Sequence, residues 1–232
     1  MNNKIPNNKT KPKNNDNKVI LQPEFIPKKN IKYIFIHPTK CGGTALEQHF
    51  KKYYSNYIYG TGHNNIASLR NNPIIVIRDP IGRFISMYKY WKNGAIDTNY
   101  KRDNEWLEKM RDVSISDFIN MIISKDNRLK TKFTWEVHYA TYERWLKQNV
   151  WKNTIVIIYK PDLNESMHKL LNLLHINHKN EILPIKNKTK CFNENTQLND
   201  DDMQKLKKYF DYDFKLYDAV LNRPNEFLYV IN

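Results

Sequence analysis

The decisive stretch of this chain is residues 33–50, which read YIFIHPTKCGGTALEQHF. The first four residues are aromatic or β-branched, and Pro38 closes the run after His37, which is typical of a short buried strand that ends in a loop. Residues 44–50 contain good helix formers, with Leu46 and Phe50 four apart on one face. The stretch therefore predicts a strand, a glycine turn and a helix.

A glycine turn between a strand and a helix is suited to holding an anion. Gly42 and Gly43 let the backbone approach a ligand, and the first helical N–H groups have no partner within the helix. The helix dipole adds positive potential there, and Lys40 brings a point charge to the same loop. A simpler interpretation is a tight turn with a solvated lysine.

The position of Lys40 argues against a nucleotide triphosphate loop. That loop has the pattern G-x-x-x-x-G-K-[ST], in which the lysine follows the last glycine. Here Lys40 precedes both glycines. The anion predicted for this loop is therefore not the triphosphate of a Walker-type site.

The bulk composition predicts one domain without a membrane span. The chain has 232 residues, enough for a substantial core. Its longest apolar runs, 74–77 and 155–158, are only strand-length, and Met1 is followed by asparagine and lysine rather than an apolar signal segment. With only Cys41 and Cys191 there is no disulfide framework, so we expect a cytoplasmic, reducing location.

The chain is strongly basic, with a formal net charge of +14. Such a balance favours polyanions in general and indicates no specific nucleic acid. A lysine- and asparagine-biased composition without a polyanionic partner is the simpler explanation. Residues 1–30 are dominated by asparagine, lysine and proline, so we expect a disordered tail there and a single domain over residues 31–232.

Strand and helix patterns alternate along that domain. The strands predicted after the first are 57–60, 74–77 and 154–159, and the helices are 81–92, one from Ser114 with a capping box, 136–149, 164–175 and one capped by Asn199. This alternation predicts an α/β fold with a central, mainly parallel sheet flanked by helices. Ligands of such sheets lie at the carboxyl ends of the strands, which here are residues 38–44, 60–63, 78–80 and 160–162.

A second anion motif lies in residues 73–91, PIIVIRDPIGRFISMYKYW. Arg78 ends the predicted strand, and Ser86 follows eight residues later, two turns into the next helix. A guanidinium can grip a phosphate with two hydrogen bonds, and a serine hydroxyl can donate to another of its oxygens. The sequence thus predicts two anion sites at neighbouring strand ends.

The two motifs together resemble the sulfotransferases that use 3'-phosphoadenosine 5'-phosphosulfate (PAPS). Residues 37–44 are similar to their 5'-phosphosulfate loop, and Arg78 with Ser86 to their 3'-phosphate motif. The resemblance implies a P-loop-like three-layer domain that binds PAPS and releases PAP. It implies these cofactor-binding residues: Lys40, Cys41, Gly42, Gly43, Thr44, Ala45, Arg78 and Ser86.

A late basic segment, Lys188-Thr189-Lys190, resembles more loosely the loop that closes over the nucleotide in these enzymes. A solvated loop explains the same residues equally well. We retain the three residues as expected cofactor contacts.

The chemistry of sulfuryl transfer assigns the remaining roles. Negative charge develops on the phosphate oxygen that the sulfuryl group leaves, and Lys40 with the loop N–H groups is placed to stabilise that charge. This logic requires no metal, and the sequence has no histidine and cysteine cluster with metal-ligand spacing.

The acceptor hydroxyl needs a general base, for which His63 is the first candidate. It follows a predicted strand end, and an imidazole has an ordinary pKa near the working pH. The order of the lysine loop, Thr61-Gly62-His63 and the arginine strand looks like the uronyl 2-O-sulfotransferase branch, which implies a carbohydrate hydroxyl as acceptor. Glu47 is the alternative base, since a glutamate in the helix after the loop has this role in other glycan sulfotransferases.

Two other classes of function stay open at the level of sequence. In a P-loop-type nucleotide kinase or NTPase, residues 74–79 would be a strand ending in a magnesium-binding Asp79, but that interpretation explains neither Arg78 nor Ser86. A basic polyanion-binding protein without catalysis would keep the same fold.

Overall fold

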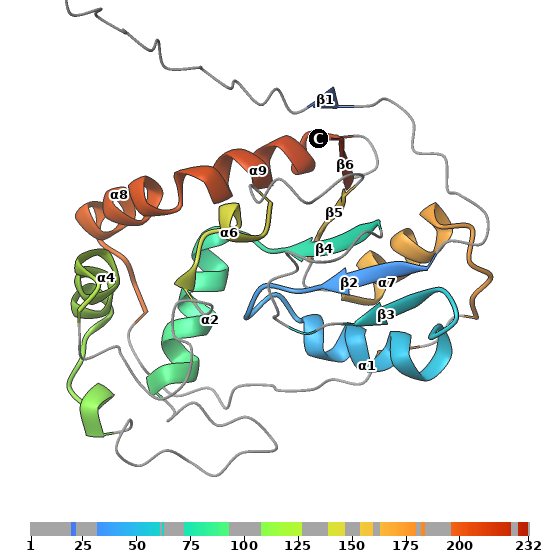
Figure 1. The fold of residues 1–232 in the computed structure, drawn as a ribbon. Coiled ribbons are helices and arrows are strands. Elements are labelled where there is room, and N and C mark those ends of the chain that lie inside the picture. Colours follow the sequence, from blue (N-terminus) through green and yellow to red (C-terminus); the bar gives the residue numbers. More distant parts are fainter. Residues whose placement is uncertain are drawn as a thin grey trace, which may run out of the picture.

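A six-stranded sheet forms the centre of the computed structural model (Figure 1). Its strand order is β1-β6-β5-β4-β2-β3. The strands are β1 (Ile20–Leu21), β2 (Tyr33–Ile36), β3 (Ile58–Gly60), β4 (Pro73–Ile77), β5 (Thr154–Ile158) and β6 (Phe227–Ile231). The structure describes residues 20–21, 32–60, 62, 72–92, 108–126, 139–146, 154–159, 163–179, 182–183, 196–223 and 227–231.

Four neighbouring strands of this sheet are parallel. Strand β2 pairs with β3 through Tyr33 and Ile58 and with β4 through Ile34 and Pro73, and β4 pairs with β5. Strand β6 is antiparallel to β5, and β1 is antiparallel to β6. This arrangement confirms the predicted α/β fold with a mainly parallel sheet.

The strand order reverses at β2. From β2 the chain passes to β3 on one side and then to β4 on the other. Such a switch point opens a crevice at the carboxyl ends of the two diverging strands, where open α/β sheets bind their ligands. The crevice between β2 and β4 is therefore the first place to look for a site.

The helices form two packing groups. The core around the sheet contains residues of α1, α6, α7 and α9, whereas α2, α4 and α8 share a second apolar cluster. Figure 1 shows this second group beyond the carboxyl end of β2. The bounds are α1 (Gly43–Tyr53), α2 (Pro80–Lys92), α4 (Ile115–Ser124), α6 (Glu143–Leu146), α7 (Leu163–Leu173), α8 (Asp200–Tyr209) and α9 (Asp211–Leu221).

Most predicted elements in the described residues agree with the structure to within one or two residues. Strands β2, β4 and β5 are buried throughout, as their continuous apolar runs indicate. Helix α4 begins with the expected capping box, in which Ser114 accepts from the N–H of Asp117 and the Asp117 side chain accepts from the N–H of Ser114. Among the described helices, none combines the length and apolar character that crossing a bilayer requires.

The predicted helix over residues 136–149 is confirmed only in part within its described residues, because Tyr139 and Glu143–Leu146 are helical but the residues between them are not. Ala140 and Thr141 are not helical, and α6 begins only at Glu143. The carbonyl oxygen of Ala140 accepts a hydrogen bond from Arg83, and the N–H of Tyr142 donates to Asp213. Because Arg83 and Asp213 bind backbone groups that would otherwise form helical hydrogen bonds, α6 does not begin before Glu143.

Two strands were not expected. Strand β6 continues the sheet beyond β5, and β1 lies in the segment predicted as a disordered tail and pairs with β6. The rest of that tail, residues 1–19 and 22–30, lies outside the described residues, as does the short segment 63–70 that contains His63.

Candidate active site at the carboxyl ends of β2 and β4

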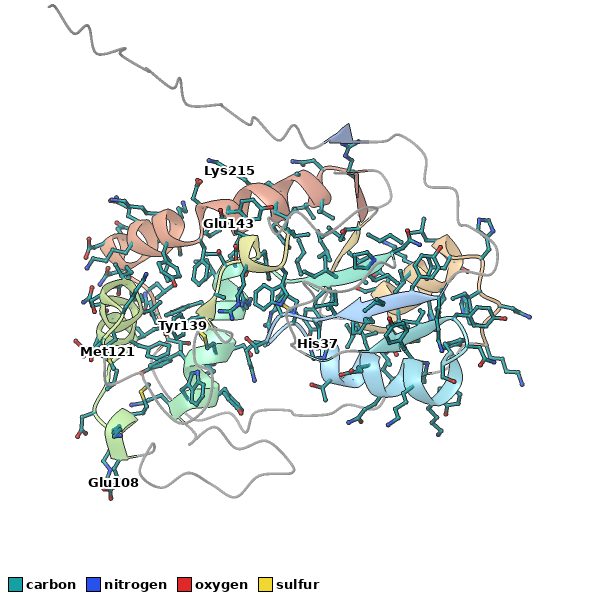
Figure 2. All side chains as sticks on the ribbon, in the orientation of Figure 1. His37, Glu108, Met121, Tyr139, Glu143 and Lys215 are labelled. Carbon is teal, nitrogen blue, oxygen red and sulfur yellow. The ribbon has the colours of Figure 1, made fainter. Side chains whose placement is uncertain are left out.

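The residues of the first motif line the switch-point crevice. The loop from His37 to Gly42 leaves the carboxyl end of β2, where Figure 2 labels His37, and α1 begins at Gly43. Arg78 follows the last residue of β4, the next parallel strand. Both predicted anion motifs therefore lie at adjacent strand ends.

The loop geometry explains why both glycines are needed. Gly42 has a φ of 70°, and a Cβ there would lie 2.5 Å from the Tyr159 ring. A Cβ on Gly43 would lie 1.9 Å from the His37 ring. Any other residue at either position would have to displace an aromatic side chain.

The N-terminus of α1 carries uncompensated positive potential. Gly42 provides no side-chain cap, and the first turn contains no acidic residue. The first N–H groups of the helix, which include those of Thr44 and Ala45, have no acceptor within the helix. This helix end has the properties of an anion site.

Two arginines hold the loop by its carbonyl oxygens. Arg83 Nε donates to the carbonyl of Thr39 at 3.1 Å, and Arg78 Nη1 donates to the carbonyl of Lys40 at 3.3 Å. Lys40 itself has a φ of 65°, which is uncommon for a residue with a side chain. The loop is thus fixed in a strained conformation of the kind that clusters at functional sites.

The second motif lies along one face of α2. A Cβ added at Gly82 would lie 3.5 Å from Arg78 Nε, so the Arg78 side chain runs against the first turn of the helix. Ser86 and Tyr90 follow Gly82 at intervals of four on the same face. Lys40 Nζ lies 4.2 Å from the centroid of the Tyr90 ring. Arg78, Ser86 and Lys40 therefore lie along the same face of α2.

The neighbouring Asp79 has a structural role at the start of α2. Its carboxylate accepts a hydrogen bond from the N–H of Gly82 in the first helical turn. A carboxylate at this position also complements the helix dipole. This contact accounts for Asp79 without a bound magnesium ion.

The side chain of Cys41 points away from the loop surface and into the core. Its side chain is fully buried, and burial raises the pKa of its thiol. The sulfur lies 3.5 Å from the hydroxyl of Tyr142. A buried, protonated thiol is poorly placed to react, so the Cys41 side chain belongs to the core behind the loop.

The side chain of Glu47, which belongs to α1, reaches the carboxyl end of the neighbouring strand β3. Its carboxylate shares a hydrogen bond with His37 Nε2 at 3.1 Å and accepts one from the N–H of Gly62 at 3.0 Å. A Cβ on Gly60 would lie 2.1 Å from a Glu47 oxygen, so this close approach requires a glycine at the end of β3. Glu47 thereby fixes the residue that precedes His63.

A buried ion pair behind the loop was not anticipated from the sequence. Arg83 Nη1 lies 3.2 Å from Asp213 Oδ2, and the guanidinium also lies over the rings of Tyr142 and Trp145. Burial raises the pKa of the Asp213 carboxyl to about 7, while Arg83 acts in the opposite direction. In either protonation state the carboxyl group can accept a hydrogen bond from the N–H of Tyr142.

A signal for this pair does exist in the sequence. Arg83 occurs on the face of α2 that carries Phe84 and Met87, and Asp213 occurs on the buried face of α9. A charge on an apolar face must have a partner. Nothing in the sequence, however, says which of the many opposite charges that partner is.

The structure brings most of the predicted site residues together. Lys40, Cys41, Gly42, Gly43, Thr44 and Ala45 form the loop and helix start, Arg78 and Ser86 lie beside them, and Glu47 lies at the far edge. His63, Lys188, Thr189 and Lys190 fall outside the described residues. Within the described part of the chain, no group of three or more His, Cys, Asp or Glu side chains could hold a metal ion.

Comparisons with known proteins show which family the chain resembles. The sequence model of the sulfotransferase family matches residues 23–218. No curated protein matches the sequence. Among solved structures, the chain is similar to mouse sulfotransferase SULT7A1 complexed with PAP, with 14% identity and a TM-score of 0.39. That match covers 80% of this chain and 65% of the mouse chain.

Proposed function

Because the chain belongs to the sulfotransferase family, we propose that it moves the sulfuryl group of PAPS to a hydroxyl group of a carbohydrate. One observation supports the cofactor most directly: the Arg78 guanidinium contacts the carbonyl of Lys40 and lies against Gly82, one turn before Ser86. The candidate 3'-phosphate arginine and the candidate 5'-phosphate loop are therefore in direct contact.

The residues fit such a cofactor. PAPS carries anionic groups at both ends of an adenosine, and the crevice offers one cationic group at each of two adjacent strand ends. The N–H groups at the start of α1, with Lys40, would hold the 5' end, and Arg78 with Ser86 would hold the 3'-phosphate. We place Cys41 among the contacts by its backbone alone, since its side chain is buried.

The same residues suit the chemistry that PAPS supplies, which is an activated sulfuryl group on a phosphate leaving group. The ammonium of Lys40 and the N–H groups after Gly42 would stabilise the charge that develops on the phosphate oxygen. They are held in place before the reaction by Arg78 and Arg83, which bind the loop carbonyls. Such preorganisation avoids a reorganisation cost at the moment of transfer.

We propose His63 as the general base and Glu47 as the group that positions it. Glu47 already shares its oxygens with His37 and the N–H of Gly62, so its carboxylate is engaged by the protein. The residue after Gly62 is His63, which Glu47 would hold near the acceptor by fixing the turn. The carbohydrate acceptor follows from the resemblance in the order of these motifs, and the basic charge suits an acidic glycan.

The cofactor proposal is tested by thermal shift. Adenosine 3',5'-bisphosphate should raise the melting temperature without magnesium, because the proposed contacts are all from protein groups. Arg78→Ala should weaken its binding by roughly 1.5–3 kcal/mol, the contribution of charged hydrogen bonds. The matched variant is Arg111→Ala, which removes an equal charge from an exposed pair with Glu108. A response to Mg-ATP alone, or equal losses in both variants, would contradict the proposal.

The acceptor is tested by sulfate transfer. Labelled PAPS is offered with a panel of uronic-acid glycans, neutral glycans and tyrosine peptides. Label in the glycans alone supports the carbohydrate proposal, and label in the peptides alone replaces it with tyrosine sulfation. Binding of PAP and glycan without transfer would instead indicate a polyanion-binding protein that keeps the fold.

A further inference from the structure

The position of the Arg78 guanidinium depends on the position of the Arg78 backbone. Strand β4 ends at Ile77, whose carbonyl accepts the N–H of Tyr159. Arg78 is therefore the first residue beyond the strand, where a chain is free to move unless another group binds it. A guanidinium aimed at a phosphate loses its precision if the backbone below it shifts.

One hydroxyl group binds both polar groups of the Arg78 backbone. The N–H of Arg78 donates to Tyr142 Oη at 2.9 Å, and the Tyr142 hydroxyl donates to the carbonyl of Arg78 at 2.9 Å. Since the hydroxyl proton goes to that carbonyl, the thiol of Cys41, 3.5 Å away, is the donor in the third contact. Tyr142 thus takes the place of a neighbouring strand at the point where the sheet ends.

Tyr142 is itself held rigidly. Its side chain is fully buried, its N–H donates to Asp213 at 2.6 Å, and the Arg83 guanidinium lies 4.8 Å from its ring centroid. The backbone of Arg78 is therefore tied to α9 through Tyr142 and Asp213. Its distance from the anion loop is fixed by the same group of residues.

We infer that Tyr142 is a positioning residue that holds Arg78 for the 3'-phosphate, with its hydroxyl as the acting group. The inference rests on the proposed function, because it assigns Arg78 to that phosphate. A merely structural tyrosine would affect stability alone. A positioning tyrosine should also set how strongly the protein prefers a nucleotide that carries a 3'-phosphate.

The experiment compares Tyr142→Phe with Tyr88→Phe, a matched variant. Tyr88 is also buried, and its hydroxyl donates to a backbone carbonyl, that of Val113, at 2.9 Å in the second apolar cluster. Affinities for adenosine 3',5'-bisphosphate and adenosine 5'-monophosphate are measured for both variants and the wild type. Both variants should lose melting temperature, Tyr142→Phe by more, because its hydroxyl makes the three contacts described above.

Only Tyr142→Phe should lose selectivity. We expect its affinity for the bisphosphate to fall roughly three- to tenfold, the worth of one or two hydrogen bonds. Its affinity for the monophosphate should change less than about twofold, because that nucleotide lacks the group that Arg78 would bind and Arg83 still holds the 5' loop at the carbonyl of Thr39. An equal loss for both nucleotides, or no loss for either, would overturn the inference.

A second measurement needs no nucleotide. Hydrogen exchange of the segment that contains Arg78 should be faster in Tyr142→Phe than in Tyr88→Phe, since the N–H of Arg78 loses its acceptor. Equal exchange in the two variants would also overturn the inference. If wild type binds the bisphosphate no better than the monophosphate, the proposed function fails, and the exchange result still decides whether the hydroxyl holds Arg78.

Discussion

The contacts of the Glu47 carboxylate bear on the choice between the two candidate general bases, His63 and Glu47. Its oxygens contact His37 and the N–H of Gly62, and the Gly60 backbone packs against it. A general base has to present its lone pair to the acceptor hydroxyl at hydrogen-bond distance. Glu47 is engaged by these protein groups, and under the proposed function this favours His63 as the base.

Substitution at each position should separate the two roles. His63→Ala should lower kcat by a factor of about 10² to 10⁴, the usual contribution of a general base, and leave the affinity for PAP unchanged. Glu47→Gln should lose less than His63→Ala, because an amide oxygen can still accept from Gly62. His178→Ala, which removes an imidazole that contacts Asn172 on the surface, serves as the control. The reverse order of losses would make Glu47 the base.

Helix α9 supports the active site from behind, although it contributes no predicted ligand. Its Asp213 binds Arg83 and the N–H of Tyr142, and those two residues hold the loop and Arg78. Removing the Asp213 carboxyl takes the carboxylate partner from the buried Arg83 guanidinium, which keeps its bonds to the carbonyls of Thr39 and Ala140, and takes the acceptor from the buried N–H of Tyr142. Each such loss is costly in a site closed to water.

Asp213→Ala should therefore lower the free energy of unfolding by about 3–5 kcal/mol, the cost of breaking a buried pair. Asp211→Ala, two residues earlier on the same helix, removes an exposed partner of Lys215 and should cost less than about 1 kcal/mol. Urea unfolding of the two variants measures the difference. Similar costs would mean that Arg83 finds another acceptor.

The elements that could be predicted from sequence are those whose signal is local. Apolar runs identified β2, β4 and β5, and Ser114 with Asp117 identified the start of α4. The predicted helix over 136–149 is interrupted at residues 140–142 because Arg83 and Asp213, distant in sequence, bind the backbone groups of Ala140 and Tyr142. A tertiary contact of this kind leaves no periodic pattern in the segment it alters.

In the whole molecule, the candidate site likewise combines local motifs, which the sequence reveals, with contacts between distant segments, which it does not. The loop of residues 37–44 and the pair Arg78 and Ser86 are short motifs, so the sequence alone is enough to propose them as cofactor contacts. Their common support joins the loop after β2, the end of β4, α2, the segment before α6 and α9, and the chain order does not reveal that these five meet. Motifs predict which groups meet the ligand, whereas the fold determines what holds those groups.

Two partly buried tyrosines near this support also predict how the whole molecule responds to alkaline pH. Burial raises the pKa of Tyr209 and Tyr212 to about 12, against about 10 in an unfolded chain. Between these values the folded state holds protons that the unfolded state has lost. Stability from these groups is therefore complete below about pH 10 and falls as the pH rises from about 10 to 12.

The melting temperature should accordingly fall over that range, and tyrosinate absorbance should rise together with unfolding. The double variant Tyr209→Phe, Tyr212→Phe removes both groups, so its melting temperature should depend less steeply on pH than that of the wild type. Lysine deprotonation affects both proteins alike and cancels in the difference. Parallel curves for the two proteins would show that these phenols ionise in the folded state as they do in water.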